Sequence, residues 1–437
     1  MSDLTLADAQ RVHLVGVGGS GMGALASLLL QMGKAVSGSD LSPSATTDRL
    51  IDAGAVIFIS HNAANLGEAE YVVRSSAVAS DNPEVVEAAR RGLPTRKLAE
   101  AVGELMHDRS AVAVAGTHGK TTTTALLTWL LQQGGLDPLA LIGADTPAFQ
   151  LGARAGDGPV VVEADHLDYF RDLVEIRDAF QALVERLPEY GRLVVCADEP
   201  CAAALHSPAR RETYGFAAEA DWHIDDYTAA PGRGARFTLR TGGRAWTVAS
   251  PLIGEHNARN VAGAIAAADY FGVGLAAILP AVASFQGPRR RFETRGRPRG
   301  IWLVDDYAHH PTEVAAVLRA AAAVAAGDVW VVFQPHTTHR TAALLDEFAR
   351  AFGDAQHALV LPIYRPTGRE LNAQPVTSAD LVSAIRSTGH PDARYVDSFD
   401  AAEAVIRDEV APGATVITMG AGDVTRLSDR LVEALGR

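Results

Sequence analysis

The sequence predicts an α/β protein built from three domains, and three observations lead to this prediction. The chain has 437 residues, which is enough for about three domains of ordinary size. Apolar strands run into glycine-rich turns near residues 16–23 and again near residues 116–121. Strand and helix patterns then alternate through the last third of the chain, as they do in doubly wound parallel sheets. We expect domains over residues 1–105, 106–288 and 289–437.

Composition and charge narrow the possible partners and the compartment. The net charge is −13, which disfavours non-specific nucleic-acid binding because such binding needs a basic patch. The two cysteines, Cys196 and Cys201, form neither a disulfide framework nor a zinc motif, and we expect them to be structural residues in a reducing cytoplasm. The N-terminus lacks an apolar signal core, and no apolar run is long enough to span a membrane.

The first domain begins with a buried strand over residues 12–17 that leads into a glycine turn. Gly16, Gly18 and Gly21 occupy the places of a G-x-G-x-x-G fingerprint, and the next strand ends at Asp40. This pattern is typical of a nucleotide whose diphosphate lies at a helix start. The fingerprint alone is weak, so a nicotinamide cofactor, a UDP-type ligand and a plain turn have similar weight.

Two further strands and one helix complete the expected first domain. Strands are predicted over residues 56–59 and 71–74, and the second of these ends at Ser75 and Ser76. A helix is predicted to begin near Asn82-Pro83, because proline suits the first helical turn. These elements predict a Rossmann-like domain.

The second domain opens with a phosphate-binding loop. A strand of alternating Ala and Val, which we expect to be buried, precedes Gly116-Thr117-His118-Gly119-Lys120-Thr121, and a helix follows at Thr122. Glycines allow the backbone to approach an anion, and the helix start adds partial positive charge. Lys120 can reach terminal phosphates and Thr121 can bind a magnesium ion. The spacing is shorter than the usual G-x-x-x-x-G-K-[ST], and the alternative is an ordinary glycine-rich turn.

An apolar strand over residues 158–165 ends in carboxylates, Glu163 and Asp165. An acid at a strand end beside a phosphate loop is a candidate magnesium ligand. The alternative is a solvated strand end. His166 follows at once, and helices and strands then continue to Cys196.

Residues 212–252 change character and predict a small antiparallel sheet, because short alternating segments are separated by glycine turns. A helix follows with His256, Asn257 and Asn260 at its start. These side chains are candidates for ligand contact, although asparagine at a helix start can also be a cap.

The alternating strand and helix patterns of the third domain predict another doubly wound sheet. One of its helices is expected over residues 341–352. Polar residues gather after two of its strands, where ligands bind in such sheets. They are Asp305, Asp306, Tyr307, His309 and His310 after one strand and Gln334, His336 and Arg340 after the next.

Taken together, these motifs resemble those of the Mur ligase family of peptidoglycan synthesis, and within it the branch that joins L-alanine to UDP-N-acetylmuramate. The resemblance covers nearly the whole chain. It rests on GVGGSGMGALA with SGSD, GTHGKTTTT, VVEAD, HLDY, GEHNARN, RRRFE, DDYAHHPTE and FQPH with Arg340-Thr341. The nearest alternative within the family is the recycling ligase that joins UDP-N-acetylmuramate to a preformed peptide, which usually departs from GVGGSGMG.

The resemblance implies a fold and a set of site residues. It implies a Rossmann-like N-terminal domain, a central P-loop domain and a Rossmann-like C-terminal domain, with ATP and Mg²⁺ as cofactors. The UDP substrate would contact Gly18, Gly19, Ser20, Gly21, Asp40, His61, Ser75 and Ser76. ATP would contact Gly116, Thr117, His118, Gly119, Lys120, Thr121, Thr122, His256, Asn257, Asn260, Arg291 and Asp306. L-alanine would contact Tyr307, His309, His336 and Arg340, and the metal would contact Thr121, Glu163 and His166. Lys120, Glu163, His166 and Arg291 would be the catalytic residues.

The sequence departs from the family beside its metal site. In the family, the strand ending in EAD is followed by a further strand before the DH pair, whereas here Asp165 runs straight into His166. One strand, on the order of twenty residues with its connections, is absent near residue 165. A second difference, at Ala144 and residues 149–152, predicts a reshaped turn.

Three hypotheses follow from these observations. The first is a working ligase with a rearranged metal site, monomeric or homodimeric, without nucleic-acid partners or membrane insertion. The second is a Mur-like protein that binds a UDP sugar with weak or no ligase activity. The third is a nicotinamide-dependent oxidoreductase, which is supported only by the first glycine turn.

Overall fold

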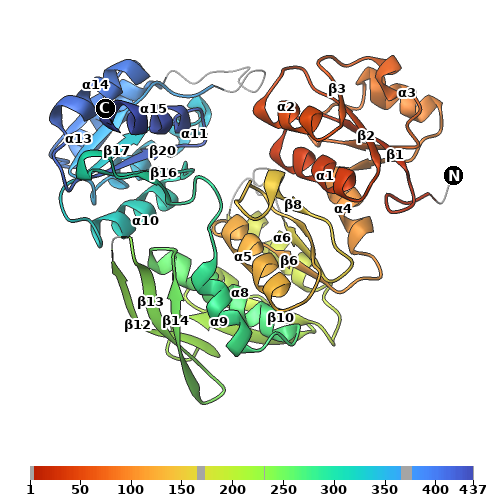
Figure 1. The fold of residues 1–437 in the computed structure, drawn as a ribbon, viewed down its shortest axis with the longest axis horizontal. Helices are drawn as coiled ribbons and strands as arrows, with labels where there is room; N and C mark the ends of the chain where they lie inside the picture. Colours follow the sequence, from red (N-terminus) through yellow and green to blue (C-terminus); the bar gives the residue numbers. More distant parts are fainter. Residues whose placement is uncertain (1–3, 165–172, 231, 366–375, 437) are drawn as a thin grey trace. The chain divides into compact units, whose positions relative to one another are not determined.

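The computed structural model describes residues 4–164, 173–230, 232–365 and 376–436 (Figure 1). The chain divides into two compact units, and neither is continuous in sequence. One unit consists of Met1–Thr213 and Gly263–Pro288, and the other of Tyr214–Ala262 and Arg289–Arg437. The described residues contain no helix that is both long and apolar enough to cross a membrane.

The first unit opens with a parallel five-stranded sheet in the order β3-β2-β1-β4-β5. Its strands are β1 (Arg11–Val15), β2 (Ala35–Ser39), β3 (Val56–Phe58), β4 (Tyr71–Arg74) and β5 (Thr95–Lys97), and its helices are α1 (Ser20–Gln31), α2 (Ala45–Asp52), η1 (Ala63–Leu66), α3 (Pro83–Arg90) and α4 (Leu98–Met106). The strand order reverses between β1 and β4, which is the kind of point where such sheets bind ligands.

Local sequence explains where these helices begin. The side chain of Ser44 accepts a hydrogen bond from the Thr47 N–H at the start of α2, and Asn82 accepts one from the Glu84 N–H at the start of α3. Pro83 occupies the first position of α3, where its missing N–H costs nothing. The helix predicted to begin near Asn82-Pro83 is therefore confirmed.

The same unit contains a second sheet, which carries the phosphate loop, in the order β6-β9-β7-β8. Its strands are β6 (Ala111–Val114), β7 (Leu139–Leu141), β8 (Ala153–Arg154) and β9 (Val160–Glu163), and the unit also contains α5 (Lys120–Gln133), η2 (Gln150–Gly152), α6 (Leu173–Val184), β10 (Arg192–Cys196), α7 (Pro200–Ala203) and α9 (Leu275–Ser284). Strands β6, β9 and β7 are parallel, and β8 runs antiparallel to β7.

Strand β6 differs from its sequence-based expectation. The Ala–Val alternation predicts a buried parallel strand, but Ala111 and Ala113 are exposed and Val112 and Val114 are only partly buried. The physical reason is its place in the sheet: among the described residues, β6 pairs only with β9. The prediction of a buried strand is therefore wrong.

The two sheets of the first unit share one hydrophobic core. Side chains of α1, including Leu25 and Leu28, belong to the same buried cluster as Leu141 and Val162 of the second sheet. Polar contacts join the same surfaces, since the Gln31 amide bonds both the carbonyl of Ala153 and the N–H of Ala155. The glycine turn after β1 and the phosphate loop after β6 are thus held in one packed unit.

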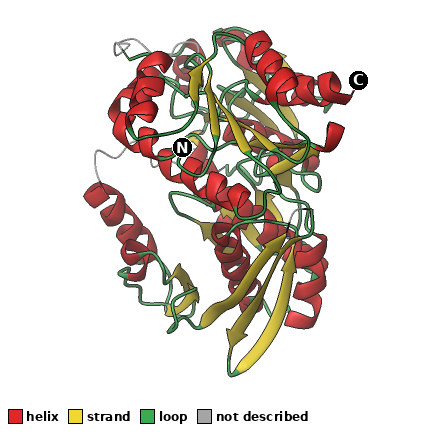
Figure 2. Cartoon of the chain, turned by 90° about the vertical axis from the view of Figure 1, so that its left-hand side faces the viewer, coloured by secondary structure: helices red, strands yellow, loops and turns green. Residues whose placement is uncertain are grey.

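The second unit contains a three-stranded antiparallel ribbon that Figure 2 shows as long yellow strands. Its strands are β12 (Trp222–Ala230), β13 (Gly234–Thr241) and β14 (Arg244–Ser250), with β11 (Arg210–Gly215) parallel to β12. The boundary between the two units falls within β11 and within α8 (Glu255–Tyr270). The antiparallel sheet expected over residues 212–252 is confirmed for β12 to β14, whereas β11 pairs in the parallel sense.

The rest of the second unit is a six-stranded sheet in the order β15-β16-β20-β17-β18-β19. Its strands are β15 (Glu293–Gly296), β16 (Trp302–Asp306), β17 (Val329–Phe333), β18 (His357–Val360), β19 (Ala393–Tyr395) and β20 (Thr415–Met419), and its helices are η4 (Pro298–Gly300), α10 (Pro311–Ala322), α11 (Thr338–Ala343), α12 (Leu345–Arg350), α13 (Ser378–Ser387), α14 (Phe399–Glu409) and α15 (Thr425–Gly436). All strands except β15 are parallel to their neighbours.

Each face of this sheet has its own core. Val331 and Phe333 pack with α10 and α12 on one face, while Trp330 and Val332 pack with α14 and α15 on the other. This confirms the doubly wound arrangement. The single helix expected over residues 341–352 is wrong, because Leu344 leaves the helical region (φ −119°, ψ 26°) and separates α11 from α12.

Candidate functional site

The glycine turn after β1 is closed by residues at the end of β2. The N–H groups of Gly16 and Val17 donate to the carbonyl of Ser39, at 2.8 and 3.0 Å. The Gly18 N–H donates to Oδ2 of Asp40 at 2.8 Å, and a Cβ on Gly18 would lie only 2.8 Å from that oxygen. A side chain at position 18 would therefore have to displace the Asp40 carboxylate, and Asp40 positions the turn that carries Gly19, Ser20 and Gly21.

Other residues proposed to contact the UDP substrate follow neighbouring strands. Asp40 follows β2, His61 follows β3, and Ser75 and Ser76 follow β4. The Ser75 N–H donates to the carbonyl of Val15 at 3.0 Å. Because the carboxyl ends of parallel strands meet at one edge of a sheet, the fold brings these residues to the same edge as the glycine turn.

The phosphate loop has the backbone that an anion site needs. Gly116 has a φ of 154° and Gly119 a φ of 78°, and both lie in a region that other residues rarely adopt. Helix α5 begins at Lys120 directly after Gly119, so the first N–H groups of the helix lie next to the loop. Thr117 and His118 complete the loop, and Thr122 is buried in the first turn.

Thr121 and Glu163 lie together at the end of this loop, as their spacing on the strand and loop predicts. The Thr121 hydroxyl donates to Oε1 of Glu163 at 3.1 Å, and the Gly143 N–H donates to Oε2 at 2.8 Å. Gly143 is also where a Cβ would lie 2.4 Å from Oε2 of Glu163. Gly143 is not among the predicted site residues, and its place after the apolar strand β7 is the signal in the sequence that points to it.

The donor set beside the loop fits a hard divalent cation only in part. The Thr121 hydroxyl and the Glu163 carboxylate supply the oxygen atoms that Mg²⁺ prefers. The described residues contain no cluster of three or more His, Cys, Asp or Glu side chains suited to a metal. His166, the remaining proposed ligand, lies outside the described residues.

The turn next to Gly143 is tightly closed. The Ile142 N–H donates to the carbonyl of Gly152, and the Leu151 N–H donates to Oδ1 of Asp145. Leu151 has a φ of 53°, which is uncommon for a residue other than glycine. This is the turn that was predicted to be reshaped at Ala144 and residues 149–152.

Two asparagines at the start of α8 are held by hydrogen bonds to their surroundings. The Asn257 amide nitrogen donates to the carbonyl of Ile253 at 2.8 Å, and its oxygen accepts from Asn260 at 3.2 Å. His256 lies against Gly254, where a Cβ would meet its ring at 2.5 Å. Asn257 therefore shapes the start of the helix whether or not a ligand binds there.

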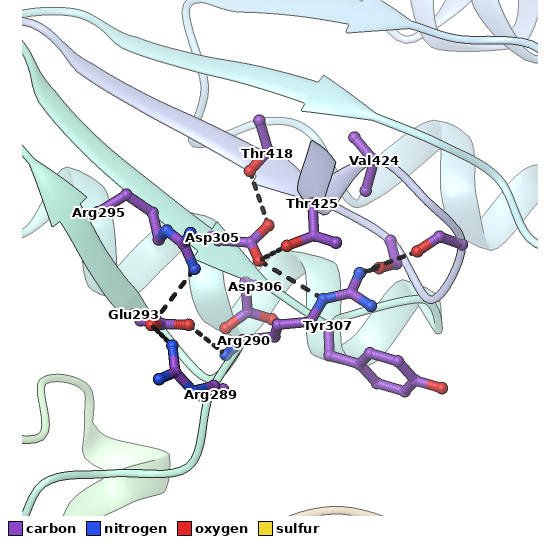
Figure 3. Close-up of polar contacts among 12 residues, drawn as sticks. Arg289, Arg290, Glu293, Arg295, Asp305, Asp306, Tyr307, Thr418, Val424 and Thr425 are labelled. Carbon is purple, nitrogen blue, oxygen red and sulfur yellow. Dashed lines mark hydrogen bonds and ion pairs between the residues drawn. The ribbon is translucent and has the colours of Figure 1, made fainter. Parts of the chain in front are cut away.

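In the second unit, Arg290 connects the segment before β15 to β16 and to the turn after β20 (Figure 3). Its guanidinium lies 3.5 Å from Oδ2 of Asp305 and donates to the carbonyls of Gly420 and Gly422. Thr418 and Thr425 each donate to the Asp305 carboxylate at 2.7 Å. Burial raises the pKa of Asp305, although Thr425 and Arg290 oppose this effect. The sequence analysis did not assign a role to Arg290, the middle arginine of RRRFE.

Arg291 is held between two residues in left-handed conformations, Arg290 (φ 58°) and Phe292 (φ 52°). The Tyr307 N–H donates to the Arg290 carbonyl, and the Phe292 N–H donates to Oδ2 of Asp306, both at 2.7 Å. The Arg291 guanidinium lies 5.2 Å from the centre of the Tyr307 ring. The structure thus brings together Arg291, Asp306 and Tyr307. Burial raises the pKa of Asp306 to about 6, against the effect of Arg291.

Aromatic and imidazole rings form a row at the carboxyl ends of β16 and β17. The ring centres of Tyr307 and His309 are 5.2 Å apart, those of His309 and His336 are 6.1 Å apart, and those of His336 and Tyr364 are 5.6 Å apart. Burial lowers the pKa of His309, although Glu313 opposes this effect, so burial favours the neutral imidazole. Tyr364 is an addition that the sequence analysis missed.

The backbone next to this row is strained. Thr337, between His336 and α11, has a φ of 66°, which is an outlier for a β-branched residue. Such conformations persist where the surroundings enforce them and gather at functional sites. Arg340 lies in the first turn of α11, which Thr337 caps.

Three family models match the chain in order. The model described as "Mur ligase family, catalytic domain" matches residues 11–110, "Mur ligase middle domain" matches residues 160–268, and "Mur ligase, glutamate ligase domain" matches residues 290–422. With the relatives below, these matches show that the chain belongs to the Mur ligase family, whose members are ATP-dependent amide-bond-forming enzymes.

Named relatives match nearly the full length. A UDP-N-acetylmuramate–L-alanine ligase from Acidobacterium capsulatum is 40% identical, with 98% of each chain covered. One from Syntrophotalea carbinolica is 38% identical, with 97% of this chain and 98% of the relative covered. The crystal structure of the UDP-N-acetylmuramate–alanine ligase from Thermotoga maritima matches with a TM-score of 0.81 at 27% identity, and covers 97% of this chain and 98% of that one. A murein peptide ligase from Psychrobacter arcticus gives a TM-score of 0.67 at 26% identity, with 98% and 99% covered.

The alignment with the Acidobacterium relative is longer than this chain. It spans 458 positions, whereas this chain has 437 residues. At least 21 aligned positions therefore have no residue in this chain.

Proposed function

We propose that this chain is an ATP-dependent ligase that joins L-alanine to the lactyl carboxylate of UDP-N-acetylmuramate in peptidoglycan synthesis. The observation that carries the proposal is the contact of Thr121 with Glu163 beside the phosphate loop. A hydroxyl and a carboxylate in contact beside a phosphate loop are the kind of oxygen ligands that a nucleotide-bound magnesium ion needs, and this supports the proposal. The names of the full-length relatives supply the substrates.

The reaction matches the residue types of the site. A carboxylate is a poor electrophile, so it first takes the γ-phosphoryl group of ATP and releases ADP. The amine of L-alanine then attacks the acyl carbon, phosphate leaves, and the amine loses a proton as the amide forms. Such steps need positioning and charge stabilisation more than a covalent nucleophile. When bound, Mg²⁺ would neutralise phosphate charge.

We assign the residues to three tasks. Lys120 and the N–H groups at the start of α5 bind the ATP phosphates, and Thr121 and Glu163 hold the metal. Arg291 and Asp306 are assigned to ATP, together with the α8 residues. L-alanine contacts the ring row, and the UDP substrate contacts the carboxyl edge of the first sheet. The residues assigned to L-alanine are Tyr307, His309 and His336 of the ring row, and Arg340 of α11.

Phosphate release is the direct test. The full-length chain is incubated with ATP, MgCl₂, UDP-N-acetylmuramate and L-alanine, with single omissions of each substrate as controls. We expect release that requires all four components, and its loss in Lys120→Met while UDP-N-acetylmuramate still binds. Release that is independent of L-alanine, or supported better by a tripeptide, would overturn the assignment of the amino acid and favour the recycling ligase.

A second candidate is a UDP-sugar-binding protein with weak or no ligase activity. The place of β6 at the edge of the described sheet favours it, because the phosphate loop then follows a strand with support on one side only. No phosphate release despite measurable binding of UDP-N-acetylmuramate would select this candidate.

The proposal also includes a cytoplasmic location and a monomeric or homodimeric state. Light scattering measures the oligomeric state.

A further inference from the structure

Glu84 is a buried acid in the first sheet that the proposed reaction does not use. It lies in the first turn of α3, and its side chain has no exposed surface. Oε1 accepts from the Asn65 amide at 2.6 Å and from the Asn62 N–H at 3.3 Å. Oε2 accepts from the Ser39 hydroxyl at 2.6 Å and faces Nδ1 of His61 at 3.2 Å.

The contacts of the Glu84 carboxylate favour its ionised form. Burial alone would raise its pKa, but His13, Ser39 and Asn65 outweigh this effect and lower the pKa of Glu84 to about 2. His13 is the other titratable group that faces it, and Nε2 of His13 lies 3.8 Å from Oε2, beyond hydrogen-bond distance. An ionised carboxylate can only accept hydrogen bonds.

These contacts determine which ring nitrogen of His61 carries the proton. Nδ1 lies 3.1 Å from the Ser39 hydroxyl oxygen and 3.2 Å from Oε2 of Glu84. The Ser39 proton is already directed at Glu84, so both neighbours of Nδ1 act as acceptors. Nδ1 must therefore donate, and in the neutral ring Nε2 keeps a lone pair.

The remaining nitrogen of His61 is available to a ligand. The His61 side chain is 16% exposed, and no hydrogen bond to Nε2 occurs among the described parts of the chain. His61 follows β3 at the same sheet edge as Asp40 and the glycine turn. A lone pair at that edge attracts a hydrogen-bond donor and not an anionic phosphate.

We propose that Glu84 is a positioning residue that holds His61 in the Nδ1–H tautomer, so that Nε2 accepts a hydrogen bond from the nucleoside half of the UDP substrate. The donor is either the uracil N3–H or a ribose hydroxyl. The proposal rests on the proposed function only in taking a UDP compound as the ligand.

Glu84→Gln is the informative variant because its orientation is dictated by its surroundings. Asn65 and the Asn62 N–H both donate toward Oε1, so the new amide must present its oxygen to them and its NH₂ to Ser39 and His61. A donor then faces Nδ1, and the ring proton moves to Nε2. Nitrogen-detected NMR on histidine-labelled full-length chain is expected to show Nδ1–H in the wild type and Nε2–H in the variant.

Binding of UDP measures the consequence. We expect Glu84→Gln to weaken UDP binding roughly tenfold or more, because one accepted hydrogen bond becomes a clash of two donors. In the ligase assay, KM for UDP-N-acetylmuramate rises while KM for ATP and for L-alanine stays unchanged. The matched control is Asn82→Ala, which removes the cap of the same helix and leaves the carboxylate in place. It is expected to lower thermal stability without changing UDP affinity or the tautomer.

Nucleotide analogues identify the donor. If N3–H is the donor, 3-methyluridine diphosphate binds the wild type weakly, and Glu84→Gln does not weaken the binding of this analogue any further. If a hydroxyl is the donor, 2′- or 3′-deoxyuridine diphosphate gives this result instead. The proposal is overturned if His61 of the wild type carries its proton on Nε2 or is doubly protonated. It is also overturned if Glu84→Gln weakens the binding of UDP and of all the analogues by the same factor. UDP binding that depends on Glu84 without any phosphate release would leave this inference standing and overturn the proposed ligase.

Discussion

The hydroxyl of Thr121 offers the sharpest test of the proposed metal site. Thr121 is buried and donates to Oε1 of Glu163 at 3.1 Å. Thr121→Val keeps the shape of the side chain and removes the oxygen. Thr124, one turn further along α5, is also buried, but its hydroxyl donates to the carbonyl of Lys120 within the helix. Thr124→Val is therefore a matched control of the same chemistry on the same helix.

The size of the effect follows from the contacts of Glu163. A hydrogen bond to a charged group contributes about 1.5–3 kcal/mol, and Glu163 keeps its bond from the Gly143 N–H and is partly accessible to water. We therefore expect a loss of stability near the lower limit, about 1.5 kcal/mol. The loss of a metal-directed oxygen has a larger effect on function, and we expect the half-saturating Mg²⁺ concentration to rise by roughly 10- to 100-fold.

The assay is phosphate release over a Mg²⁺ titration, with thermal unfolding measured on the same samples. Thr124→Val should leave the Mg²⁺ dependence unchanged, because its hydroxyl bonds only to the helix backbone. Equal Mg²⁺ curves for wild type and Thr121→Val would refute the metal assignment. Equal shifts for both threonine variants would show that packing of α5, and not the hydroxyl at position 121, controls activity.

Two further predictions concern the second unit. The pKa of Asp306 in the folded state is raised to about 6, above the ordinary value near 3.8, so folding is favoured when the side chain is protonated. We therefore expect about 3 kcal/mol of stability to be lost as pH rises from about 4 through 6. Hydrogen exchange of β16 measured against pH tests this prediction, and a flat profile would contradict it. Phe333 is fully buried against Phe348 and Phe352, so Phe333→Ala should lower the free energy of unfolding of this unit by about 3–5 kcal/mol, and a loss below 1 kcal/mol in a urea titration would contradict the packing.

Much of the fold was predictable because its signals are local. Apolar runs such as residues 329–333 form buried strands, and Asn82-Pro83 marks a helix start. The phosphate loop was equally predictable from the sequence, because the conformation at its glycine and lysine positions depends on neighbouring residues alone. The pairing of Thr121 with Glu163 could also be inferred, because Glu163 ends β9 and Thr121 follows the neighbouring parallel strand β6, and the carboxyl ends of such strands share an edge.

Features that depend on distant neighbours were not predictable. The alternation in β6 indicates a buried strand, but its exposure depends on how many strands pair with it, which no local pattern records. The roles of Gly143 and Arg290 depend on contacts with residues 20 and 130 positions away.

The sequence by itself determined the family, the order of the elements and the chemical character of the loops, because short local motifs specify these features. Only the tertiary structure decided which polar groups meet in the interior. Glu84 shows the reason: a glutamate in the first turn of a helix is ordinarily solvated. Its burial against Ser39, His61 and Asn65 arises only when three elements pack together and their hydrogen bonds offset the cost of removing a charge from water.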